Sequence, residues 1–483
     1  MKRHVLGALL AVLVAIGAGC GSAAQGGGSF GASAQSMPAD SLAYLDINLD
    51  QGSAAWTQLD QLAAKFPAWK SWVGEFKKSA NSGSGDVKLN ELEPLLGGDA
   101  GIAVTGFDTS SSKPGLSYVA AISITDKSKV ADELTSHGGK RDGSYEGFDI
   151  YKNGAGEEAA VGNHTLLVAS SDAELRKAID TNGSGGSLAD DSTYKAARAE
   201  APHASLAYGY VNPSKLAPML ALAGGMGGDP STKNLAQSLA STQWASVWLA
   251  PRDNGIGLGA AVKHTDGSAP TGLPETNPAA TLPADTLAYL AESGLGGLGG
   301  ALTGQMGMSG APMTRADKAM VAELTNLLAG DSVLSVRPGL PVSVALVLHP
   351  SDPAAAEAQV EKLLKMATKN TSGVGMKDGA LVIPEANIKV TAERKGDALV
   401  IGNDPTAGTT PDQPLSQSDR YASLLSAAGA PSDATVPVYI DVHGLLGLVP
   451  VSQDRNLQAL DGAIVWVKPD GDITRGGVFI ALR

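Results

Sequence analysis

The chain has 483 residues, roughly three times the length of a typical domain, which allows two large domains or three ordinary ones. Hydrophobic residues make up 43% of it, an ordinary share for a globular protein, but aromatic residues make up only 5% and glycine reaches 60 residues, so small side chains must do much of the packing. The formal net charge of −13 argues against nucleic acid and against an anionic lipid surface as binding partners.

The N-terminus has the pattern of a secretion signal. Lys2 and Arg3 precede an apolar run, residues 5–16, that is too short for a membrane-spanning helix of about 20 residues. We therefore predict a signal peptide over residues 1–19. Its removal takes away two basic side chains and leaves the mature chain more acidic still.

Cys20 is the only cysteine of the protein, and it follows the small residues Gly17–Gly19. This arrangement resembles the lipobox of bacterial lipoproteins, whose cysteine is lipidated and becomes the mature N-terminus, although that family usually has leucine where this chain has Gly17. The resemblance implies an exported protein held by its lipid on the extracytoplasmic face of the cell membrane. The alternative is an ordinary signal peptide, with Cys20 discarded or left as a free thiol. No disulfide can form within the chain in either case.

Residues 20–37 are rich in glycine, serine and alanine, and they predict a flexible tether between the membrane and the first folded unit. That unit is predicted over residues 38–264. It opens with a strand marked by Leu42 and Tyr44.

An aromatic segment follows, with hydrophobic residues at spacings of three, four and seven that predict a helix, which Pro67 should kink or divide. Two interpretations are open: a helix packed on a sheet, or a wall of an apolar pocket or partner-binding surface. The aromatic residues of this candidate binding face are Trp56, Phe66, Trp69, Trp72 and Phe76.

Further along the first unit, Leu89–Leu96 predicts a helical stripe that ends at Gly97–Asp99. The unit closes with a predicted hairpin whose turn is Asp253-Asn254-Gly255, because Asn-Gly is a strong hairpin signal. Other strands are predicted over residues 102–104, 118–124, 148–151, 164–168 and 204–211.

A proline-rich stretch, residues 265–281, predicts a linker, and a second folded unit follows over residues 282–483. The two units share short matches in the same order. Pro38–Leu45 recurs as Pro283–Leu290 with a single change of serine to threonine. Because hairpins dominate the connections, we predict an α+β fold of two tandem, internally duplicated units, each a mainly antiparallel sheet packed with helices.

The export signal, the repeated Pro-Ala-Asp-[Ser/Thr]-Leu-Ala-Tyr strand, the Phe66-Pro67-Ala68-Trp69 segment and Leu95-Leu96-Gly97-Gly98-Asp99 together resemble the bacterial envelope proteins of domain-of-unknown-function family 3352 (DUF3352). The resemblance covers most of the mature chain. It implies a location in the cell envelope and this architecture, and it carries over no catalytic residues.

Recognisable catalytic patterns are missing from the sequence. The seven histidines form no His-x-x-x-His pair, so no metal site is predicted, and a serine triad has no marker. Gly294–Gly299 matches Gly-x-Gly-x-x-Gly, but the chain beyond it has no βαβ pattern and the repeat has no equivalent after Tyr44. We therefore predict no cofactor and no enzymatic activity.

Methionines gather in the second unit, where methionine and glycine together favour an adaptable apolar surface. The alternative is ordinary packing in a glycine-rich core. The leading hypothesis is a membrane-anchored protein that binds an apolar ligand such as a lipid, or another envelope protein; the alternatives are a scaffolding lipoprotein and an extracytoplasmic hydrolase. The methionines added to the candidate binding face are Met306, Met308 and Met313.

Overall fold

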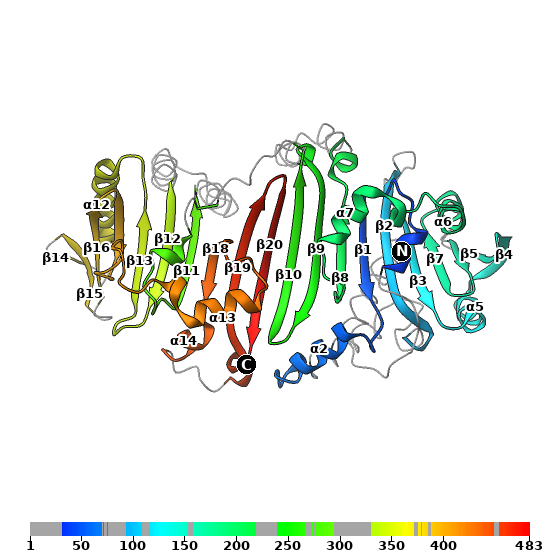
Figure 1. The fold of residues 1–483 in the computed structure, drawn as a ribbon, viewed down its shortest axis with the longest axis horizontal. Coiled ribbons are helices and arrows are strands. Elements are labelled where there is room, and N and C mark those ends of the chain that lie inside the picture. Colours follow the sequence, from blue (N-terminus) through cyan, green and yellow to red (C-terminus); the bar gives the residue numbers. More distant parts are fainter. Residues whose placement is uncertain are drawn as a thin grey trace. The chain divides into compact units, whose positions relative to one another are not determined.

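The computed structural model describes residues 31–69, 71, 75, 93–108, 115–152, 158–218, 239–265, 273–274, 277–293, 330–370, 375–377, 379–384, 388–448 and 454–483. The chain divides into two compact units (Figure 1). Unit 1 is Met1–Ser268 with Asp470–Arg475, and unit 2 is Ala269–Pro469 with Gly476–Arg483.

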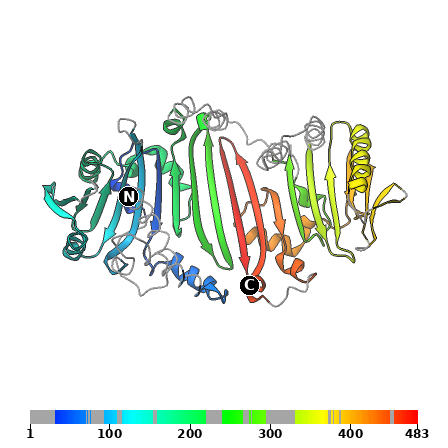
Figure 2. The same ribbon diagram turned by 180° about the vertical axis from the view of Figure 1, so that it is seen from behind.

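The strands of unit 1 form one antiparallel sheet. Neighbouring strands pair in the order β10-β9-β8-β1-β2-β3-β7-β6-β5-β4 (Figures 1 and 2). Their bounds are β1 (Ala43–Asn48), β2 (Leu96–Asp108), β3 (Gly115–Ile124), β4 (Lys140–Tyr145), β5 (Phe148–Lys152), β6 (Glu158–Val161), β7 (Thr165–Ala169), β8 (Ala207–Val211), β9 (Thr242–Arg252) and β10 (Gly255–His264). The described helices, with η for 3-10, are η1 (Ala32–Ser36), α2 (Ala54–Ala63), η2 (Glu93–Leu95), α5 (Lys127–Ser136), α6 (Asp172–Ser184), η3 (Leu188–Asp190) and α7 (Ser192–Ala199).

Unit 2 repeats this strand order, β20-β19-β18-β11-β12-β13-β17-β16-β15-β14. Its strands are β11 (Ala288–Ser293), β12 (Asp331–Arg337), β13 (Ser343–Leu348), β14 (Gly375–Lys377), β15 (Ala380–Ile383), β16 (Ile388–Lys395), β17 (Ala398–Gly402), β18 (Thr435–Ile440), β19 (Leu460–Asp470) and β20 (Ile473–Leu482). Its described helices are η4 (Pro278–Ala280), α12 (Pro353–Asn370), η6 (Leu415–Gln417), α13 (Asp419–Ala427), α14 (Val442–Leu446) and α15 (Arg455–Gln458).

The prediction of an α+β fold with mainly antiparallel sheets is confirmed. Among the described strands, each one in unit 1 has the neighbours in its sheet that the strand numbered ten higher has in unit 2. This correspondence is what the predicted internal duplication requires, and the duplication itself stays a prediction. The predicted hairpin at Asp253-Asn254-Gly255 is present as β9 and β10.

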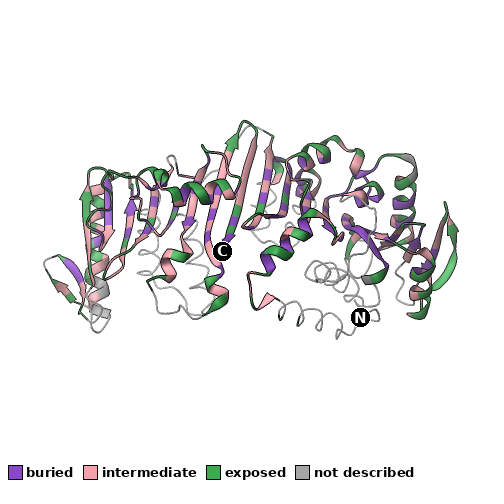
Figure 3. Ribbon diagram, turned by 60° about the horizontal axis from the view of Figure 1, so that its bottom comes forward, coloured by how far each residue is buried: buried purple, intermediate pink, exposed green. Residues whose placement is uncertain are grey.

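One face of the unit 1 sheet carries the main core. Tyr44, Val119, Leu167 and Trp248 project from its strands into the same buried cluster as residues of α6 and α7. Burial alternates along β9, because successive side chains point to opposite faces. Figure 3 shows buried and more exposed bands following one another along strands of the structure.

The opposite face is covered only at its ends by the described helices. At one end, Val130 of α5 and Leu95 of η2 pack with Ile122. At the other end, Trp56 and Leu59 of α2 pack with Leu206, and Leu249 and Ile256 lie against them. Between these two clusters the sheet presents aliphatic side chains to the surface.

Two predicted linkers are partly wrong. Within the predicted tether 20–37, residues 32–36 form η1, and Ala34 and Met37 are buried in the core of unit 1. Within the predicted linker 265–281, residues 278–280 form η4 and Ala279 is fully buried. Small residues give the same composition to a loose linker and to a tightly packed segment, so composition alone could not separate the two.

The helical stripe predicted over Leu89–Leu96 is also wrong where the structure describes it. The chain is a 3-10 turn over Glu93–Leu95 and then enters β2 at Leu96. β2 approaches β3 so closely at residue 97 that a Cβ there would come within 2.8 Å of the Ser123 Cβ, so this strand pairing requires glycine.

Candidate functional site

Of the aromatic residues of the predicted binding face that the structure describes, only Trp56 is buried. Trp56 on α2 is 3% exposed, and its Nε1–H donates to the Asn48 carbonyl oxygen at 2.9 Å. Phe66 and Trp69 follow α2 and are half-buried. Trp56 therefore packs as part of a helix on a sheet, which was the alternative interpretation of this segment. Trp72, Phe76, Met306, Met308, Met313 and Cys20 lie outside the described residues.

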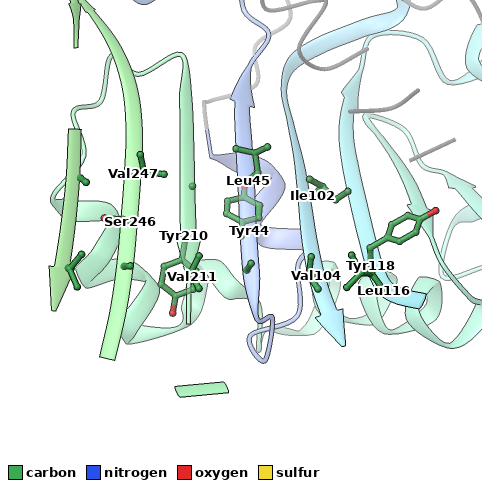
Figure 4. A pocket seen from close by; sticks show the side chains of 15 residues that line it. Tyr44, Leu45, Ile102, Val104, Leu116, Tyr118, Tyr210, Val211, Ser246 and Val247 are labelled. Atoms are coloured by element: carbon green, nitrogen blue, oxygen red, sulfur yellow. The ribbon is translucent and has the colours of Figure 1, made fainter. Parts of the chain in front are cut away.

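The structure instead places an apolar groove on the open face of the unit 1 sheet. The register sets Leu45 of β1 beside Ile102 of β2 on one side and beside Gly209 of β8 on the other, and Gly209 pairs with Val247 of β9. By this register the four positions form a row across the sheet, and Figure 4 labels three of them, Leu45, Ile102 and Val247. The row consists of large aliphatic side chains with a gap at the glycine.

Gly209 makes the floor of this groove. A Cβ placed on Gly209 would come within 2.9 Å of Val247 Cγ1, so the Val247 side chain lies over the glycine and any side chain at position 209 would displace it. The groove has a volume of about 430 Å³. Its open-face lining, alongside the row, includes Val104, Leu116, Tyr118, Val211, Ala245 and Val262.

Two of the walls are unusually exposed for aliphatic side chains. Leu116 on β3 is 44% exposed and Val247 on β9 is 42% exposed. The groove therefore has apolar area in contact with solvent. Removing such area from water on ligand contact is favourable by about 25 cal/mol of free energy per Å².

The chemistry of the lining favours binding. Among the described residues that line the groove there is no histidine, cysteine, carboxylate or basic side chain. Its hydroxyl-bearing residues are Tyr44, Tyr118, Tyr210 and Ser246. Tyr44, Tyr210 and Ser246 belong to the buried layer of the opposite face, and burial raises the pKa of Tyr210 to about 12. The lining thus offers neither a metal ligand set nor a general base near neutral pH.

The equivalent face of unit 2 has the same aliphatic row without the gap. Leu290 pairs with Leu334 and with Val438, as Leu45 pairs with Ile102 and with Gly209. Val438 therefore stands at the position of Gly209. Leu290 and Leu334 are again strongly exposed, so an open apolar sheet face is common to both units.

The described part of the chain brings together no group of three or more His, Cys, Asp or Glu residues that could hold a metal ion. Within the same residues, no helix combines the length and the apolar character needed to cross a bilayer.

Comparisons with known proteins give a family and no activity. The family model described as "Protein of unknown function (DUF3352)" matches residues 4–379. No curated protein matches this chain significantly. The solved structures that match include crystal forms III, I and IV of TP0453, at 9%, 9% and 8% identity and TM-scores of 0.28, 0.27 and 0.28. The matches cover 49%, 50% and 48% of this chain and 82%, 82% and 80% of the other, and at such TM-scores they carry no argument about function.

Proposed function

Because the chain belongs to DUF3352, a family without an assigned activity, we propose its function from its own geometry: a membrane-anchored extracytoplasmic protein that binds an apolar ligand in the unit 1 groove. The observation that carries the proposal is the apolar groove itself, which Gly209 lines together with aliphatic and aromatic residues. Gly209 is the one position of the row without a side chain, and Val247 lies over it.

The size and lining of the groove support a hydrocarbon ligand. Small-molecule sites commonly enclose about 300–1,000 Å³ and are lined mainly by apolar side chains, with few polar groups to orient the ligand. The groove falls in that range at about 430 Å³. With Leu45, Ile102 and Val247 as walls and no charged group in the described lining, it suits a lipid acyl chain better than a polar metabolite.

The proposed location rests on the sequence at Cys20. A lipid anchor there would hold unit 1 close to a supply of acyl chains. The chain's acidity disfavours a direct electrostatic attachment to anionic headgroups, so the anchor would supply the membrane association.

A second candidate is binding of another envelope protein. It is favoured by the exposed aliphatic residues that both units share, because large exposed apolar patches commonly mark protein interfaces. A hydrolase is the least supported alternative, because the described groove lining supplies no residue that could act as general base.

The test is ligand retention by residues 21–483, the mature chain without its lipidated Cys20, which keeps every described residue. We expect native mass spectrometry to find a bound lipid that unfolding releases, and an environment-sensitive fluorescent fatty acid to bind saturably. Leu116→Lys and Val247→Lys should each weaken that binding about tenfold or more, since a charge would have to be buried against the hydrocarbon.

Leu334→Lys is the matched control. Leu334 is 41% exposed on the equivalent face of unit 2, so the substitution changes charge and exposed aliphatic area in the same way without touching the groove. A clean apo mass together with no saturable probe binding would reject the ligand-binding proposal and direct the search to protein partners.

A further inference from the structure

Two carboxyl groups lie buried beneath η1 in unit 1. Asp46 on β1 and Asp99 on β2 are each 0% exposed. Asp46 pairs with Gly101, two residues along β2 from Asp99, so both side chains lie on the helix-covered face. Unit 2 does not repeat the pair, because the strand register puts Ala291 at the position equivalent to Asp46.

Ser33 of η1 joins the two carboxyl groups. Its backbone N–H donates to Asp99 Oδ2 at 2.7 Å, and its hydroxyl donates to Asp46 Oδ1 at 3.1 Å. The same hydroxyl is hydrogen-bonded to the Tyr44 hydroxyl at 2.7 Å. A Cβ on Gly101 would come within 2.4 Å of Ser33 Oγ, so the strand leaves room for this contact only because residue 101 is glycine. The strands thus form a specific seat for η1.

One oxygen in this seat has no partner. Asp46 Oδ2 is buried without a hydrogen bond. It faces Gly31, the first described residue, since a Cβ placed there would lie 3.8 Å from it. A buried carboxylate that lacks partners is costly, whereas a protonated carboxyl group is far less so.

The surroundings of Asp46 also favour its protonated form. Burial and then the nearby Asp99 raise the pKa of Asp46 well above its usual range, although the Ser33 hydrogen bond and the Arg198 charge lower it. The titratable and charged groups that face it are Tyr44 on its own strand, Asp99 on β2, and Tyr194 and Arg198 on α7. Arg198 alone among them carries a positive charge.

We propose that Ser33, Asp46 and Asp99 form a proton-dependent latch, which holds η1 on unit 1 while Asp46 is protonated and loosens it when Asp46 ionises. A carboxyl group whose pKa is higher in the docked state stabilises that state fully below its ordinary value of about 3.9, and the stabilisation is lost as the pH rises through the docked-state pKa. Acid therefore tightens this latch, in contrast to a carboxylate held by an ion pair.

Because of the position of η1 in the chain, the latch would control the length of the segment between Cys20 and unit 1. η1 follows directly on the segment that joins Cys20 to unit 1. Release of residues 31–37 would extend the reach of that segment by up to about 25 Å. This consequence rests on the proposed lipid anchor, whereas the latch itself does not depend on it.

The test compares amide hydrogen exchange in residues 31–37 between the mature chain and its Asp46→Asn variant. Both proteins are measured at the same pH, so the intrinsic effect of pH on exchange cancels. Asparagine keeps an acceptor for Ser33 and cannot ionise. We expect the variant to exchange about tenfold or more slowly than the wild type at about pH 8, and the two to agree within a small factor at about pH 5. Equal exchange at both pH values, or faster exchange in the variant at about pH 8, would overturn the proposal.

Ser33→Ala provides the second variant, with exchange in β8 as the check that unit 1 remains folded. Loss of the serine hydroxyl should speed exchange in residues 31–37 at about pH 5 and reduce its dependence on Asp46. If Ser33→Ala leaves this segment as protected as in the wild type, the latch is rejected even when Asp46→Asn does not fold.

Discussion

Gly209 in unit 1 and Val438 in unit 2 occupy the same position in two sheets with the same strand order. Gly209 pairs with Leu45, and Val438 pairs with Leu290, the counterpart of Leu45 in the repeated octapeptide. The two positions therefore differ by one isopropyl group: glycine lines the groove of unit 1, and valine stands at the equivalent position of unit 2. If the two units arose by duplication, this position is where the candidate binding site became specific to unit 1.

Adding a side chain at position 209 should weaken ligand binding. Gly209→Ala places a methyl group 2.9 Å from Val247 Cγ1, so Val247 must turn further into the groove. We expect affinity for the fluorescent fatty acid to fall about tenfold, with a change in the free energy of unfolding of about 1 kcal/mol or less.

Gly257→Ala is the control for this substitution. It makes the same glycine-to-alanine change on β10, where Gly257 is absent from the groove lining. Unchanged affinity in Gly209→Ala, with the methyl group accommodated, would mean that the groove at Gly209 is not the binding site.

The sequence allowed the repeated strands and the hairpin at Asp253-Asn254-Gly255 to be predicted, because both depend on local patterns. The packing of η1 could not be predicted in that way. Ser33 lies in a stretch whose composition is typical of a tether, and its partner Asp99 is 66 positions away in the sequence. Only tertiary contacts distinguish this segment from a loose linker.

The groove was missed for a related reason. Leu45, Ile102, Gly209 and Val247 come from four separate strands, and each follows an ordinary alternating pattern. The predicted binding face included Trp56 because aromatic clusters are typical of binding surfaces, but they are equally typical of cores. The available signal was subtler: aligning the repeat through Tyr210 and Tyr439 places glycine opposite valine.

Truncation of Trp56 should reduce stability first. Its side chain is 3% exposed and packs with Leu59 and Leu206, so Trp56→Ala should lower the free energy of unfolding of unit 1 by about 3–5 kcal/mol. Urea unfolding followed by circular dichroism measures this. Loss of fatty-acid binding without loss of stability would instead place Trp56 in the binding surface, which is the second of the two interpretations of the aromatic segment.

The Arg337 network should govern the acid stability of unit 2. Arg337 donates from Nε and Nη2 to the two carboxylate oxygens of Asp285, each at 2.8 Å, and from Nη1 to Asp404 Oδ2 at 2.9 Å. Burial raises the pKa of Asp404, but hydrogen bonds from Thr406 and Arg337 outweigh it and hold that pKa below its usual range. A lowered carboxyl pKa contributes stability above about 3.9 that is lost as the pH falls through the folded-state value.

Arg337→Gln removes the guanidinium and leaves Asp404 buried. We expect a loss of about 3 kcal/mol at neutral pH and an acid-unfolding midpoint that moves to higher pH. Lys365→Gln is the control, because Lys365 pairs with Glu361 on the exposed surface of α12 and should contribute little. An acid midpoint in Arg337→Gln equal to that of the wild type would contradict the assignment.

Substitution of Cys20 tests the proposed anchor. The chain has a single cysteine, so incorporation of labelled fatty acid that resists solvent extraction should occur in the wild type and disappear in Cys20→Ser. In cell fractionation, Cys20→Ser should then be absent from the membrane fraction. Stable attachment needs more than one acyl chain, and no other membrane anchor is proposed. Gly17→Leu restores the residue that lipoboxes usually have at this position, and it should leave lipidation intact or increase it. Persistence of Cys20→Ser in the membrane fraction would show that another part of the chain, or a bound partner, holds the protein there.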